Sequence, residues 1–82
     1  MIKNDELANP TSCLNRAQPD EPVFVLRAKD VCAAQAIRYW CSLRVDFGKN
    51  VSLDDQITEA LGLAKQMDDW RARQARERLG VK

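Results

Sequence analysis

The segment from Val23 to Ala28 is the one run in this sequence with the composition of a β-strand. Side chains alternate across a strand, so Val23 and Val25 share one face and Phe24 and Leu26 share the other. Both faces are apolar, and both backbone edges need hydrogen-bond partners. A strand of this kind restricts the fold, because it must be covered on two faces and paired along its edges.

Three arrangements satisfy this predicted strand. The N-terminal arm folds back as a second strand, although it contains Pro10 and offers few apolar anchors. Alternatively, the strand pairs with its copy around a two-fold axis, or it is an extended segment that packs on helices and meets water along its backbone. We expect the second arrangement, and therefore a homodimer or a higher homo-oligomer.

A helix is predicted from Val31 to about Phe47, directly after the strand. Asp30 is a favourable N-cap residue, and Gly48 stands where a left-handed C-cap residue would fall. Apolar side chains recur at steps of three and four residues, which is the spacing of one helix face. This predicted stripe consists of Ala33, Ala36, Ile37, Trp40, Leu43 and Phe47.

A second long helix is predicted from a cap at Ser52 to Leu79, with Gly80 as its stop. Gly62 either weakens this helix or lets another backbone approach it closely. Its predicted apolar stripe consists of Leu53, Ile57, Ala60, Leu61, Ala64 and Met67. A short turn joins the two helices, so they are expected to form an antiparallel hairpin.

These elements predict a mainly α chain with a short β element, in the α+β class. Residues 1–11 are expected to form a flexible arm, and residues 12–80 a single small domain in which the strand precedes the hairpin. Trp40 and Trp70 are expected to seal the helix interface. A domain of this size buries only about 60–65% of its unfolded surface, so its core is thin.

Composition excludes several classes of function. The net charge is +1, and no run of about 18 apolar residues stands anywhere in the chain, so a transmembrane helix is not expected. The first residues lack the apolar core of a signal peptide, which favours a cytoplasmic location. Cys13, Cys32 and Cys41 form no CxxC pair and have no histidine to complete a metal site, so neither a metal nor a cofactor is expected.

Arg27 and Asp30 are the first candidates for a ligand site, because they flank the predicted junction of strand and helix. Backbone N–H groups at such a junction point toward anions, and a basic side chain there adds charge. The structural alternative is that Arg27 pairs with Asp20 or Glu21 and that Asp30 only caps the helix.

Arg38 and Tyr39 are the second pair of candidates, on the first long helix. An arginine beside an aromatic ring is typical of sites that stack nucleobases. Tyr39 lies off the apolar stripe and is therefore expected to be exposed. The alternative is that both residues belong to an ordinary solvated helix face.

The C-terminal segment is the most unevenly charged part of the chain. Residues 71–82 carry five basic groups and one acidic group, whereas residues 51–70 carry five acidic groups and one basic group. The four arginines Arg71, Arg73, Arg76 and Arg78 are candidates for a nucleic-acid contact. They equally suit docking on the acidic half of a neighbouring subunit, or a solvated helix end matched to the helix dipole.

The sequence around the predicted strand resembles a family of short phage and prophage proteins. These proteins share a segment of the form D-E-P-x-F-x-L-R-x-x-D that is followed by two helices, and the resemblance covers about residues 13–70. The shared positions are Asp20, Glu21, Pro22, Phe24, Leu26, Arg27 and Asp30.

The resemblance implies a phage accessory protein that acts in the host cytoplasm by binding. It would inhibit a host defence system, either by sequestering a nucleotide signal or by blocking a protein complex. No catalytic constellation accompanies the motif: Ser12, Ser42 and Ser52 have no histidine to activate them, so an enzyme is not expected. The alternative function is a small nucleic-acid-binding regulator that uses the four arginines.

Overall fold

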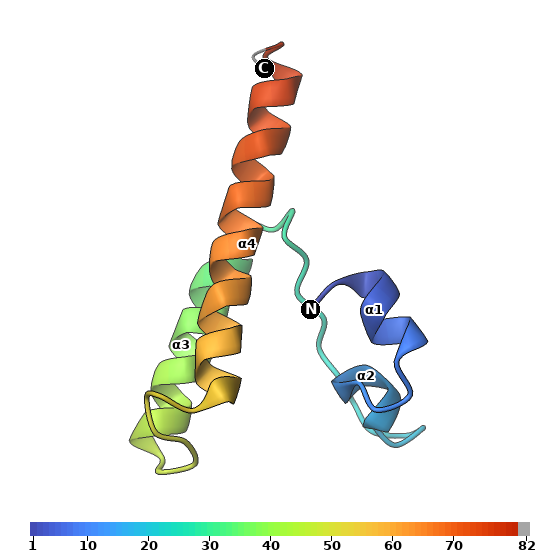
Figure 1. Ribbon diagram of the computed structural model, residues 1–82, viewed down its shortest axis with the longest axis vertical. Helices are drawn as coiled ribbons and strands as arrows, with labels where there is room; N and C mark the ends of the chain where they lie inside the picture. Colours follow the sequence, from blue (N-terminus) through green and yellow to red (C-terminus); the bar gives the residue numbers. More distant parts are fainter. Residues whose placement is uncertain (81–82) are drawn as a thin grey trace.

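Two antiparallel helices, α3 (Ala33–Asp46) and α4 (Asp55–Arg78), form the main body of the protein (Figure 1). Two short helices precede them, α1 (Lys3–Ala8) and α2 (Cys13–Arg16). The computed structural model describes residues 1–80. The helices α1 and α2 contact each other, and α3 contacts α4, but no contact joins the two pairs in the described part of the chain. An extended segment connects them.

The predicted strand is not formed, and the α+β class is wrong: residues 1–80 are helical and contain no strand. The segment from Val23 to Arg27 is extended and Ala28 begins a turn, but residues 1–80 contain no strand that could pair its backbone (Figure 1). It is not covered by the hairpin either, since Phe24 is 86% exposed. The composition of the segment is that of a strand, but strand pairing requires a partner that this chain does not supply.

The N-terminal pair is held together by hydrogen bonds rather than by a core. Ser12 caps α2 and accepts a hydrogen bond from the backbone N–H of Asn15 at 3.2 Å. The side-chain amide of Asn15 donates to the carbonyl oxygens of Glu6, Leu7 and Asn9 at 2.8–3.1 Å. Every residue of α1 and α2 remains accessible to water, so this unit gains little from apolar burial.

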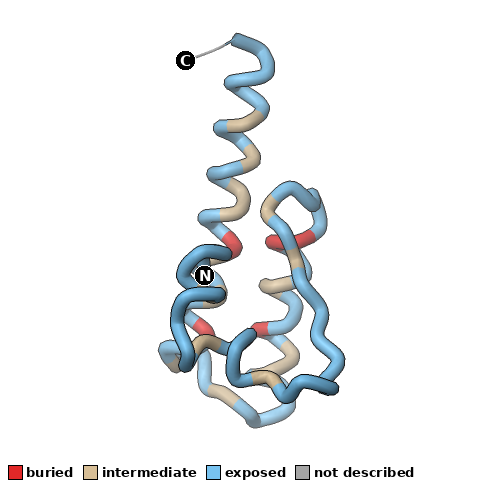
Figure 2. Tube along the Cα trace, turned by 90° about the vertical axis from the view of Figure 1, so that its right-hand side faces the viewer, coloured by how far each residue is buried: buried red, intermediate tan, exposed pale blue. Residues whose placement is uncertain are grey.

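The core of the hairpin is made of small side chains. Figure 2 marks the buried positions in red along the chain, and none lies in the N-terminal segment. The buried residues of the described chain are Ala33, Ala34, Cys41, Ile57 and Ala64. Small side chains let two helices approach closely, which makes the contact tight but limits the apolar area that it buries.

The predicted stripe of the first helix is therefore only partly right. Ala33 is buried, but Ala36, Trp40 and Phe47 face water, and Cys41 takes a place in the contact instead. Trp40 and Trp70 keep 39% and 37% of their surface exposed, so they do not seal the interface. Large aromatic rings between α3 and α4 would hold the two backbones apart. The buried alanines and Cys41 are small, so they allow the helices to pack closely.

The connection between α3 and α4 is organised by Asp54, the N-cap residue of α4, and not by Ser52 as predicted. Its carboxylate accepts hydrogen bonds from the side chain of Asn50 at 3.0 Å and from the backbone N–H of Val51 at 2.9 Å. These bonds, the Asn50 bond foremost, lower the pKa of Asp54 from its ordinary value near 3.8. At the other end of the turn Gly48 adopts a φ of 70°, as predicted for a left-handed cap.

Replacing Gly62 by Ala is expected to stabilise α4. No atom lies within 4 Å of the position that a Cβ would occupy, so glycine serves no close approach within this chain. Alanine should raise the free energy of unfolding by about 0.5–1 kcal/mol, because glycine loses more backbone entropy in a helix. Urea denaturation followed by circular dichroism measures the change. A loss of stability would instead show that another surface contacts α4 at Gly62.

Candidate anion-binding site

The C-terminal part of α4 extends beyond its partner helix. The helix α4 has 24 residues and α3 has 14, so the last turns of α4 project past the start of α3 (Figure 1). This projecting part carries the arginines of the basic segment.

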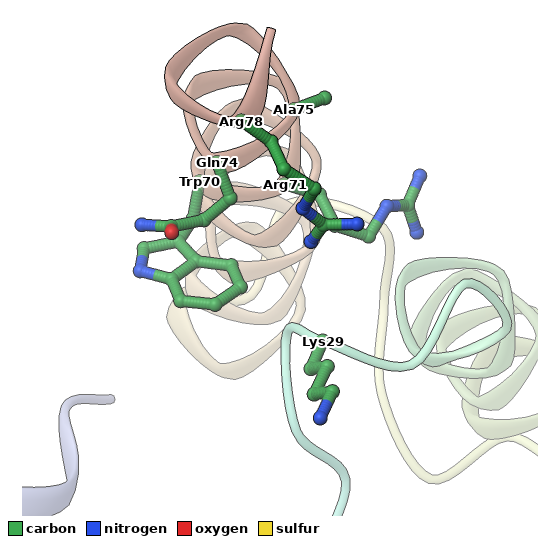
Figure 3. Close-up of a pocket in the computed structure, with 6 residues that line it drawn as sticks. All are labelled: Lys29, Trp70, Arg71, Gln74, Ala75 and Arg78. Atoms are coloured by element: carbon green, nitrogen blue, oxygen red, sulfur yellow. The ribbon is translucent and has the colours of Figure 1, made fainter.

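A hollow of about 490 Å³ lies where this projecting part faces the turn before α3. The residues that line it are Lys29, Trp70, Arg71, Gln74, Ala75 and Arg78 (Figure 3). Five of them come from α4 at spacings that place them on one side of the helix, and Lys29 comes from the turn. The hollow is a shallow, open depression on the surface and not an enclosed cavity.

The lining of the hollow contains three cations and no carboxylate. The nearest acid to Arg71 is Asp68, whose Oδ1 lies 3.6 Å from the guanidinium. The other carboxylate oxygen of Asp68 is taken by Arg38, at 2.7 Å. The Nη1 atom of Arg71 is buried and has no hydrogen-bond partner among the described residues. Arg71 therefore keeps one unsatisfied donor, which carries an energetic cost, but this atom is enclosed by the protein and is not accessible to a ligand in the hollow.

This combination of groups suits a ligand that has both a phosphate and a flat ring. The planar fork of an arginine donates two parallel hydrogen bonds to phosphate oxygens, and Lys29 adds a third positive charge. Trp70 presents a partly exposed indole beside Gln74, and an indole stacks on any nucleobase. The hollow can therefore hold a phosphate on its arginines and a base on its indole.

The four residues predicted around the first helix do not share a hollow of this kind. Asp30 accepts a hydrogen bond from the backbone N–H of Cys32 at 2.8 Å, one step before α3 begins. Arg38 is engaged by Asp68, and Tyr39 is exposed. Arg27 has no ion pair in the described chain, so its predicted pairing with the acidic turn is absent. A role of these residues in binding stays a prediction.

The basic segment is divided between two sides of α4. Arg71 and Arg78 are seven residues apart, which is close to two helical turns, and both line the hollow. Arg73 and Arg76 do not line it and fall on the other side of the helix.

Sequence reasoning gave no ligand-binding role to Trp70, Gln74 or Ala75, and it considered Lys29 only as added charge at the predicted junction of strand and helix. A sequence signal for Trp70 and Gln74 does exist. Together with Arg78 they recur every four residues in the part of α4 that projects beyond α3, so the three lie on one side of the helix. Lys29 has no such signal, because only the path of the turn before α3 brings it to the hollow.

Residues 1–80 contain no cluster of three or more His, Cys, Asp or Glu residues that could hold a metal ion. Within the same range, no helix is long and apolar enough to cross a bilayer. The chain matches no protein-family model, no curated protein and no solved structure. The resemblance to short phage proteins therefore stays a prediction that rests on the motif between Asp20 and Asp30.

Proposed function

We propose that this protein acts by binding and not by catalysis, and that the hollow at Trp70 takes a phosphate-bearing nucleotide. The observation that carries the proposal is the lining itself: Lys29, Arg71 and Arg78 line the same hollow as a partly exposed indole. No carboxylate is among the lining residues, and the one acid paired with them in residues 1–80 is Asp68, 3.6 Å from Arg71. A nucleotide supplies the anion and the ring that these groups recognise.

The biological role that fits this site best is sequestration of a nucleotide signal. The resemblance to short phage proteins implies a binding protein that interferes with host defence in the host cytoplasm. A small protein that holds a signal nucleotide would act in that way by lowering the free concentration of the signal, without any chemical step.

The runner-up function is a nucleic-acid-binding regulator. Four arginines along one helix favour a polyanion, but Arg71 and Arg78 lie on one side of α4 and Arg73 and Arg76 on the other. A duplex docked on one side would therefore meet only half of these charges. Because phosphate contacts dominate such binding, fewer contacts mean weaker binding and a shallower dependence on salt.

Titration calorimetry with ATP, with inorganic triphosphate and with a single-stranded oligonucleotide tests the proposal. We expect ATP to bind, and the double variant Arg71→Ala/Arg78→Ala to weaken that binding at least about tenfold through the loss of charged hydrogen bonds. The matched control is Arg73→Ala/Arg76→Ala, which removes the same charge from the same helix. It should change the affinity less than about threefold.

The variant Trp70→Leu separates the two halves of the ligand. It should weaken binding of ATP by several fold and leave binding of inorganic triphosphate unchanged, since only the base uses the indole. The nucleic-acid function would be supported instead if the two double arginine variants lost affinity equally and the oligonucleotide bound more tightly than ATP. No binding of any of the three probes at low salt would overturn the proposal.

A further inference from the structure

The single chain leaves much more surface in contact with water than a folded protein of its mass does. Its accessible area is 6903 Å² for 9.3 kDa. A compact monomer of this mass exposes about 5,000 Å². The excess is about 1,900 Å², and each subunit of a standard interface buries about 800 Å². Less than half of the excess is therefore enough for a stable dimer.

The shape and the core lead to the same conclusion. The radius of gyration is 14.7 Å, against about 11.7 Å for a compact chain of this length. The buried side chains are four of small size and Ile57. Large apolar side chains remain outside, and a contiguous exposed apolar surface marks an interaction site.

One flank of α3, beside its buried face, is the part of this surface that is organised along one helix. Ala36, Trp40, Leu43 and the C-cap residue Phe47 follow one another at steps of four, three and four residues, and we call this set the α3 stripe. Trp40, Leu43 and Phe47 line a second hollow of about 290 Å³, so their side chains gather at one place. The guanidinium of Arg44 lies 5.6 Å from the ring centre of Trp40 and holds the indole in position.

We infer that a second copy of this chain covers the α3 stripe, with the two α3 helices antiparallel about a two-fold axis. The stripe is self-complementary in that arrangement. Trp40 of each chain lies opposite Leu43 of the other, and Ala36 lies opposite Phe47, so that a small residue meets a large one at each end. The spacing of four and three residues is that of knobs-into-holes packing.

This interface is independent of the nucleotide hollow. The stripe lies on α3 and the hollow on the projecting part of α4, and the two sets of lining residues have no member in common. The dimer therefore carries two such hollows, and loss of one property does not remove the other.

Size-exclusion chromatography with light scattering tests the inference. At about 50 μM the wild-type chain is expected to run as a dimer. Phe47→Glu should raise the dissociation constant at least about 30-fold, because it removes the large apolar side chain that covers Ala36 of the other copy and places a carboxylate against an apolar surface at both ends of the interface. Phe47 is 74% exposed in the single chain, so this change leaves the hairpin folded, which the helical circular dichroism signal checks. The matched control is Leu53→Glu, at an exposed leucine outside α3, which should remain a dimer.

Mixing two charged variants tests the antiparallel register. Trp40→Glu and Leu43→Lys chains are each expected to dimerise weakly, but together they should form a one-to-one heterodimer, since position 40 faces position 43. Failure of the mixture to associate would overturn the register. A wild-type monomer at 50 μM, or a dimer that Phe47→Glu does not weaken, would overturn the interface. The monomer would indicate that the chain's own extended segment, with Phe24, covers the stripe.

Discussion

The variant Ile57→Ala is expected to lower the free energy of unfolding by about 2–4 kcal/mol. Ile57 is 2% exposed and is the largest of the five buried side chains in residues 1–80. Its removal takes away apolar contact and leaves a cavity between α3 and α4, which the small neighbouring side chains cannot fill. A domain with so thin a core has little stability to lose, so a substantial fraction of the variant should be unfolded at 25 °C.

Urea denaturation followed by circular dichroism measures this effect, with all samples at one protein concentration so that association does not shift the midpoint. The matched control is Leu61→Ala, one turn further along α4 at a position 42% exposed. It should cost less than about 1 kcal/mol, because it removes less buried area and introduces the best helix former. If Ile57→Ala and Leu61→Ala lowered the free energy of unfolding by similar amounts, Ile57 would not be part of the buried core.

The variant Ala64→Leu is expected to destabilise the hairpin by about 1–3 kcal/mol, although leucine is the more apolar residue. Ala64 is fully buried where α4 faces α3, and Ala33, Ala34 and Cys41 are the buried residues on the facing helix. A longer side chain at position 64 forces the backbones of α3 and α4 apart and disturbs the other contacts between the two helices.

The control for this variant is Ala72→Leu, the same substitution on the exposed projecting part of α4. It should change stability by less than about 0.5 kcal/mol. Thermal or urea unfolding of both variants decides the matter. A stabilising Ala64→Leu would mean that the helices are not closely packed at this point.

The two long helices could be predicted from local signals alone. Gly48 and the apolar spacing on either side of it indicate two helices and a turn, and both helices are present within a few residues of the expected ends. The exact start of α4 differed, because Asp54 and not Ser52 is the N-cap residue, and its carboxylate accepts hydrogen bonds from Asn50 and Val51 in the turn rather than from the first N–H groups of the helix. Ser and Asp are both favourable N-cap residues, so two of them close together in the sequence leave the first residue of the helix undetermined.

The strand could not be judged from its own residues. The run from Val23 to Ala28 has strand composition, but a strand needs a second segment to pair with, and residues 1–80 form no strand. The buried face of the first helix was mistaken for a similar reason. Periodicity shows that Ala36, Trp40 and Phe47 share a face, but not whether α4 or another surface covers it.

The candidate site shows the same division. Charge in the sequence pointed to the basic end of the second helix, and Arg71 and Arg78 do line the hollow. Which of the four arginines act together depends on the helix phase and on the point at which α3 begins. The part played by Lys29 depends on the path of the turn, which brings it beside Trp70 across some forty residues of sequence.

Local residue patterns are enough to predict two long helices joined by a glycine turn, a basic C-terminal end and a strongly apolar segment before the first long helix. These properties depend on side chains within a few residues of one another, which is the range of helix propensity, capping and charge. Three features become visible only in the packed structure. Small residues form the contact between α3 and α4, the aromatic rings of Trp40 and Phe47 remain partly or largely exposed, and α4 extends beyond the start of α3. These features depend on how closely α3 and α4 can approach each other. That distance is set by residues far apart in the sequence, so no local sequence pattern predicts it.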